Sequence, residues 1–236
     1  MKTHHLVCAI LGLSSALTAF AADPVTDAMT SAYAPYRAAL YRTNSKSQAD
    51  SEAAIAQAKQ SWKVVAEQFA SAPPAPYNRD AHFAKTVAEV AAFYELAETE
   101  IKANKLAQAH ETLEKARDLM ADIRRRNGVI VFSDHMNAYH AEMEVILEEA
   151  PRLASQPQGM LLVMERMGSL QYLSRQLRSQ APAHLLSDPG FVSALQSLEK
   201  SLAALRETVL AQDAAKFKEL LPKIKSPYSQ LFLKFG

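Results

Sequence analysis

Cysteine is nearly absent from this 236-residue sequence, because the only one is Cys8, near the start of the chain. The rest of the chain can form no disulfide within itself and no thiolate metal site. It can hold neither an iron–sulfur cluster nor a haem attached through C-x-x-C-H, since both need cysteine. Its stability must therefore come from packing.

Glycine is also scarce, with 6 residues in the chain, and no stretch shows the apolar–polar alternation of a β-strand bounded by turn residues. Helix-favouring residues dominate, and apolar side chains recur at helical spacing, as in Phe83, Val87, Val90 and Tyr94. The sequence therefore predicts an all-α protein. Its helices are expected over roughly 25–43, 46–71, 80–104, 106–126, 133–150, 158–179, 188–211 and 213–234.

An excess of either charge is missing too: 26 Lys and Arg face 25 Asp and Glu. Nucleic-acid binding relies on basic surfaces that neutralise phosphates, so we expect no nucleic-acid partner. The sequence has no G-x-S-x-G, no H-E-x-x-H and no glycine-rich phosphate loop. We therefore expect a protein that is not an enzyme.

One long apolar run is present, over residues 6–20. It follows a short basic start at Lys2 and ends in the small-x-small pattern of Ala19, Phe20 and Ala21. This order is typical of a secretory signal peptide, and the run is too short for a permanent anchor. We expect residues 1–21 to be removed. The mature chain would then be periplasmic or secreted, without a transmembrane segment.

The two halves of the mature chain align without a gap when the sequence is shifted by 108 positions. Asp80 then falls on Asp188, and Phe83 falls on Phe191. The matching loops favour an internal duplication over a chance alignment of amphipathic helices. We therefore predict two tandem up-down four-helix bundles, over residues 22–131 and 132–236.

This organisation resembles the periplasmic four-helix-bundle cytochromes of the soluble cytochrome b and cytochrome c-prime types. The resemblance implies a haem that is attached through C-x-x-C-H or held between an early Met and a late His. Met29 and Met136 lie early in their halves, but the last predicted helix contains no His. The missing signatures argue against haem. A noncovalent haem electron carrier that uses His140 and one Met remains an alternative.

The richest set of metal-ligand side chains lies on two consecutive predicted helices. Met136, His140 and Met143 share a stripe on the first, and Met164 and Met167 share a stripe on the second. An antiparallel hairpin would place the stripes against each other, with His140 near Met164. Because thioether sulfur and imidazole nitrogen favour soft metals, these five residues predict a copper site.

A methionine stripe is also an ordinary feature of a helical core. Under the shift of 108, however, the five candidates fall on residues that are neither Met nor His, namely Ala28, Ala32, Pro35, Ala56 and Lys59. This comparison favours a role beyond packing. The sequence thus predicts a carrier, sensor or tolerance protein for a soft metal. The alternative is a metal-free interaction or structural module.

Other polar residues have simpler interpretations. One group of charged residues at helical spacing is interpreted as a solvated or inter-helix salt-bridge face, namely His110, Glu114 and Arg117, with Asp118 and Arg124. Asp134 or Glu144 is placed to orient a ligand imidazole from outside the ligand set.

Cleavage after Ala21 predicts a mature protein that begins at Ala22. N-terminal sequencing of protein recovered from the periplasm checks this prediction. Ala21→Arg is expected to block processing, because the cleavage site requires a small residue there. An exported protein that retains residues 1–21 would contradict it.

Overall fold

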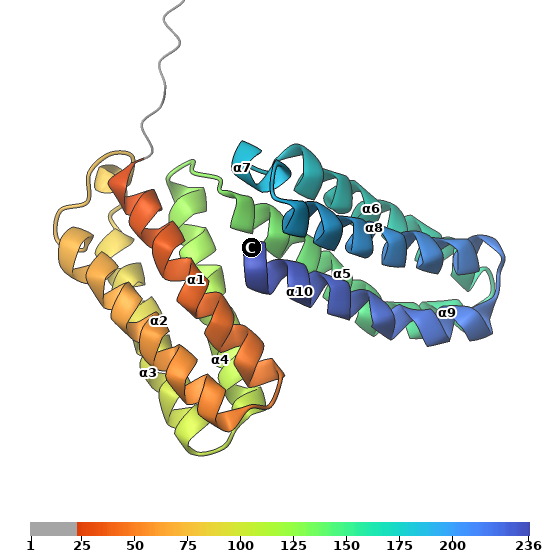
Figure 1. Ribbon diagram of the computed structural model, residues 1–236, viewed down its shortest axis with the longest axis horizontal. Coiled ribbons are helices and arrows are strands. Elements are labelled where there is room, and N and C mark those ends of the chain that lie inside the picture. The colour runs from red at the N-terminus through yellow and green to blue at the C-terminus, as the bar shows by residue number, and fades with distance from the viewer. Residues whose placement is uncertain (1–22) are drawn as a thin grey trace, which may run out of the picture.

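The computed structural model describes residues 23–236, and every regular element within that range is a helix (Figure 1). The prediction of an all-α protein is therefore confirmed. The signal peptide predicted over residues 1–21 lies outside the described residues. Within the described part of the chain, no helix combines the length and the apolar character needed to cross a membrane.

The first half is an up-down bundle of four helices (Figure 1). Neighbouring helices pack together in chain order, and the first packs against the last to close the ring. The 3-10 turn η1 (Tyr77–Arg79) lies in the longest connection. The helices are α1 (Pro24–Asn44), α2 (Gln48–Phe69), α3 (Phe83–Lys102) and α4 (Leu106–Arg126).

Aromatic side chains fill the centre of this bundle. Tyr36, Trp62 and Tyr94 are at most 1% exposed, and the ring of Tyr94 lies 6.2 Å from that of Tyr36 and 6.4 Å from that of Trp62. The polar atoms are satisfied, since Trp62 Nε1 donates to the Val87 carbonyl and Tyr36 Oη donates to that of Leu113. Large rings with bonded polar tips give a core of this kind both burial and specificity.

The second half repeats the arrangement with a broken last helix. Helix α5 packs on α6, α6 on α8, and α8 on α9 and α10, while α10 returns to α5. Pro222 interrupts the last helix, because proline has no N–H to donate. The elements are α5 (Phe132–Ala154), α6 (Gly159–Ser179), α7 (Ala183–Leu186), α8 (Pro189–Leu210), α9 (Ala214–Leu220), η2 (Leu221–Ile224) and α10 (Lys225–Phe235).

Most helix bounds follow the sequence prediction closely. The helix expected over 213–234 is instead divided into α9, η2 and α10, the short helix α7 was not predicted, and α5 is longer than predicted. Pro151 was expected to separate two helices, but it lies within the last turn of α5, which runs on to Ala154. The connection after it reverses at Gln158, a non-glycine residue with a positive φ of 60°.

The two halves are compatible with an internal duplication. Asn104 and Gln212, which the shift of 108 superimposes, both turn the chain with positive φ, at 57° and 53°. The buried positions of α1 and α5, however, match at a shift of 107, which places Met29 on Met136. In packing terms Met136 corresponds to a buried methionine and not to Ala28. The comparison that favoured a metal role for Met136 is therefore wrong at this position.

The two bundles meet where α4 leads into α5 and diverge from there (Figure 1). Helix α1 packs against α10 across this junction, and Arg37 Nη1 donates to the Phe232 carbonyl at 3.1 Å. The side chain of Arg124, 3% exposed, forms a two-pronged ion pair with Asp134 of α5, with Nε 2.9 Å from Oδ2. Asp134 also accepts from the Val131 N–H and so caps α5.

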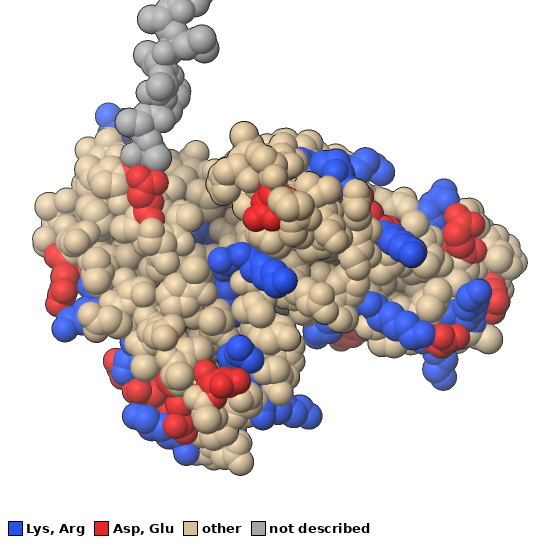
Figure 2. Space-filling model, in the orientation of Figure 1, with Lys and Arg blue, Asp and Glu red and all other residues tan. Residues whose placement is uncertain are grey.

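The outer surface has no single dominant charge. In the view of Figure 2, acidic and basic side chains are interspersed over both bundles, in keeping with a formal net charge of +1. The charged groups that matter for the junction are instead the few that lie between the bundles.

Arg124→Met is expected to lower the free energy of unfolding by about 3 kcal/mol, because it leaves the Asp134 carboxylate without its buried partner. The matched control is Arg178→Met, which removes a similar two-pronged pair with Glu199 at an exposed position. That control should cost less than about 1 kcal/mol. Urea unfolding measures the free energy of unfolding of both variants. Equal losses in the two would contradict a stabilising role for burial of the Arg124–Asp134 pair.

Candidate functional site

A cleft of about 320 Å³ lies at the junction of the two bundles. Its lining comes from α1 and α4 of the first half and from α5 and α10 of the second, so neither half forms it alone. Aromatic and aliphatic side chains supply part of the lining. The ionisable residues in it are His110, Glu114, His140, Glu144 and Lys225.

The α4 wall of the cleft carries His110 and Glu114, one helical turn apart. His110 Nδ1 lies 3.0 Å from the Leu40 carbonyl, which can only accept, so Nδ1 carries a hydrogen. Burial is the main cause that lowers the pKa of His110, although Glu114 opposes it. The ring is therefore neutral at neutral pH, and its Nε2 presents a lone pair 3.9 Å from Glu114 Oε1.

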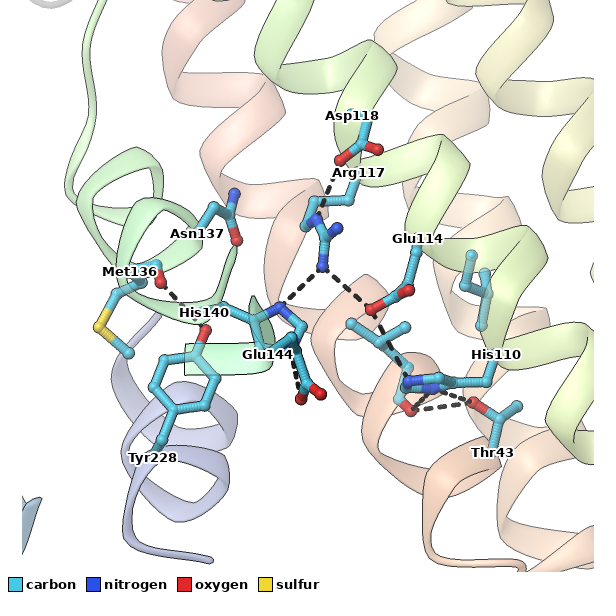
Figure 3. A network of polar contacts seen from close by, with 12 residues as sticks. Thr43, His110, Glu114, Arg117, Asp118, Met136, Asn137, His140, Glu144 and Tyr228 are labelled. Carbon is cyan, nitrogen blue, oxygen red and sulfur yellow. Dashed lines mark hydrogen bonds and ion pairs between the residues drawn. The ribbon is translucent and has the colours of Figure 1, made fainter. Parts of the chain in front are cut away.

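Arg117 connects this wall to α5 (Figure 3). Its Nη1 lies 3.3 Å from Glu114 Oε1 and 3.0 Å from His140 Nδ1. Because a guanidinium only donates, His140 Nδ1 must accept, which leaves the ring hydrogen on Nε2. The two imidazoles of the cleft therefore hold opposite tautomers.

Glu144 completes the network on the second bundle. Its Oε1 lies 3.3 Å from His140 Nε2 and 2.9 Å from Lys225 Nζ. The hydrogen bond from His140, followed by the pairing with Lys225, lowers the pKa of Glu144 to about 2, although burial opposes the shift. Glu144 is therefore ionised at any physiological pH.

Tyr228 fixes the plane of the His140 ring. The two rings are parallel within 4°, with centroids 5.2 Å apart, and Tyr228 Oη donates to the Met136 carbonyl at 3.1 Å. Burial raises the pKa of Tyr228 well above its ordinary value, so the hydroxyl stays protonated. His140 thus has its two nitrogens and one face held by neighbours.

The structure divides the five predicted copper ligands between two places. Met136, Met143 and Met167 are 0% exposed in the core of the second half, and Met164 is half-buried against that core. His140 instead faces the junction, and Figure 3 shows the Met136 sulfur directed away from its ring.

Over residues 23–236, no three His, Cys, Asp or Glu side chains are grouped so that they could hold a metal ion. That finding does not bear on methionine sulfur. The copper site therefore stays a prediction.

Sequence reasoning underestimated His110, Glu114 and Arg117. They were interpreted as a salt-bridge face, and they do bridge helices, but they also line the shared cleft. The sequence held a usable signal: His and Glu recur four positions apart in two consecutive helices, at 110 and 114 and again at 140 and 144.

Comparison of the chain with protein-family models, curated proteins and solved structures gives no match. The resemblance to four-helix-bundle cytochromes therefore remains a likeness of architecture.

Glu144→Gln is expected to lower the free energy of unfolding at neutral pH by about 1 kcal/mol, a modest value because the side chain is 41% exposed. Since the folded pKa of about 2 lies below the ordinary 4.5, this stabilisation is present above pH 4.5 and is lost as the pH falls toward 2. Urea unfolding of both proteins across that range measures the difference.

The control for this prediction is Glu67→Gln, which removes an exposed carboxylate paired with Lys63 in the same helix. A gap between wild type and Glu144→Gln that stays constant from pH 7 down to pH 2 would refute the linkage.

Proposed function

We propose that this chain is an exported, non-enzymatic binding protein, a carrier or sensor, that takes a small ligand into the cleft between its two bundles. The observation that carries the proposal is the shared lining of the cleft. Side chains from α1, α4, α5 and α10 converge on one space, and an ordered polar network joins them.

The character of the cleft supports a small ligand. Sites for small molecules commonly lie between domains and have volumes of roughly 300–1,000 Å³, and this cleft has about 320 Å³. Leu40, Tyr41, Tyr228 and Phe232 provide apolar contact area. A few polar groups beside such a surface are what fixes a ligand's orientation.

The state of the ionisable groups favours binding over catalysis. Glu114 is held by Arg117, and Glu144 by His140 and Lys225, so both carboxylates are engaged as anions. The pKa of Glu144 is moved away from neutrality, whereas a general acid or base works best with a pKa near the working pH.

Export is supported by the N-terminal pattern of a signal peptide. Outside the cytoplasm a thiol-free binding site is chemically durable, because thiols are readily oxidised there.

A soft-metal carrier is the second candidate, and the observation that favours it is the burial of Met136, Met143 and Met167 on the facing helices α5 and α6. It would place Cu(I) among sulfurs inside the second bundle. Copper that binds to wild type, is lost in Met143→Leu and is unaffected by blocking the cleft would support this candidate over the first.

Asn44→Trp is the direct test of the cleft, because Asn44 lines it at the exposed end of α1 and an indole there would occupy the space. Native mass spectrometry of wild type exposed to the small molecules of a periplasmic extract should show a bound ligand. The variant should lose it.

The matched control is Gln108→Trp, an exposed residue of α4 that does not line the cleft. It should retain the ligand. Retention of the same ligand by Asn44→Trp, or a wild type that takes up nothing from the extract, would overturn the proposal.

A further inference from the structure

One polar atom of the cleft faces an acceptor instead of a donor. Within residues 23–236, no hydrogen-bond donor reaches His110 Nε2, and Glu114 Oε1 lies 3.9 Å from it. A lone pair and a carboxylate at this separation are suited to receive a group with several N–H donors between them. A primary ammonium has three such donors.

This acceptor pair is open to the cleft. The His110 side chain is 23% exposed and that of Glu114 is 32% exposed. Glu114 accepts from Arg117 at 3.3 Å, and a carboxylate has about four lone-pair sites, so capacity for a further donor remains.

The same cleft also contains a positively charged donor, the Lys225 ammonium, which is suited to an anionic group of a ligand. Lys225 is 43% exposed and forms an ion pair with Glu144, with Nζ 2.9 Å from Oε1, and its ammonium group carries three N–H donors. Its charge is close enough to His110 to contribute to lowering the pKa of that imidazole. Because His110, Glu114 and Lys225 all line the same cleft of about 320 Å³, the acceptor pair and this ammonium lie within reach of one small molecule.

The charges around the cleft are already balanced. Glu114 is paired with Arg117, and Glu144 with Lys225, while the hydrogen-bond pattern described above gives each imidazole one ring hydrogen. Asp118, a further partner of Arg117, is 70% exposed and does not line the cleft. A ligand with a net charge would leave that charge uncompensated in a half-buried space, whereas a zwitterion would not.

We propose that the ligand is an amino acid or a closely related small zwitterion. His110 Nε2 and the Glu114 carboxylate receive its ammonium group, and Lys225 receives its carboxylate. The apolar part of the ligand lies against Tyr41 and Tyr228. This assignment rests on the proposed function of the cleft and specifies its ligand class.

Isothermal titration calorimetry of the mature protein against the twenty L-amino acids, putrescine and succinate tests the assignment. At least one amino acid should bind, while the diamine and the dicarboxylate should not. The N-acetyl derivative of the best ligand should bind at least about tenfold more weakly, since it lacks the ammonium group and its charge-assisted hydrogen bonds.

Glu114→Gln should weaken the best amino acid by about tenfold or more. The control Glu111→Gln removes an exposed carboxylate on the same helix, outside the cleft, and should leave binding unchanged. The N-acetyl comparison uses wild-type protein, so it remains decisive even if Glu114→Gln fails to fold.

Failure of the zwitterion assignment can be distinguished from failure of the proposed binding function of the cleft. If no amino acid binds, or if the N-acetyl derivative binds as well as its parent, the zwitterion assignment is overturned. A different ligand that Asn44→Trp excludes would still support the cleft. An amino acid that binds equally well to Asn44→Trp would overturn both proposals.

Discussion

Two arginines of α4 link the first bundle to the second, and the geometry of the shared cleft depends on them. Arg117 and Arg124 lie two helical turns apart, so they share one face of α4. Helices α4 and α5 make little backbone contact, and it is these long side chains that reach His140 and Asp134 across the gap. Without them, two separate bundles would be joined only through α1, α10 and a short connection.

Burial of these charges is stable because each guanidinium has a carboxylate partner. Arg124 has a two-pronged carboxylate partner and lies 5.9 Å from the centroid of the Tyr33 ring, which adds a cation–π contact. Arg117 divides its donors among Glu114, Asp118 and His140. In a medium of low dielectric constant, this pairing fixes the orientation of α5 and, with it, the position of the side chains that line the cleft.

Much of the fold could be predicted from local signals. Asn127 and Gly128 end α4, where Gly128 takes a positive φ of 68°, and Asp188 with Pro189 begins α8. Such residues act within one or two turns of their own position, so a single sequence reveals them. The all-α architecture followed from the same signals.

The candidate site could not be predicted in the same way, because its contacts join distant parts of the chain. Met136 and Met143 lie along nearly one line of α5, and His140 lies only a fraction of a turn away, so spacing alone assigns all three to one stripe. The structure sends the sulfurs to the core and His140 to the junction, because Arg117 and Tyr228 are available there. The residues available as partners, and not the helical spacing, decide whether a side chain at the edge of the apolar stripe, such as His140, faces the core or the junction.

The most direct test of this account is the tautomeric state of the two imidazoles, measured by ¹⁵N NMR of histidine side chains in the mature protein at neutral pH. The account predicts a hydrogen on Nδ1 of His110 and on Nε2 of His140, because the Leu40 carbonyl must accept and Arg117 must donate. Opposite tautomers in this assignment would establish the network that joins the bundles. The same tautomer in both rings, or rapid averaging between tautomers in either, would contradict it.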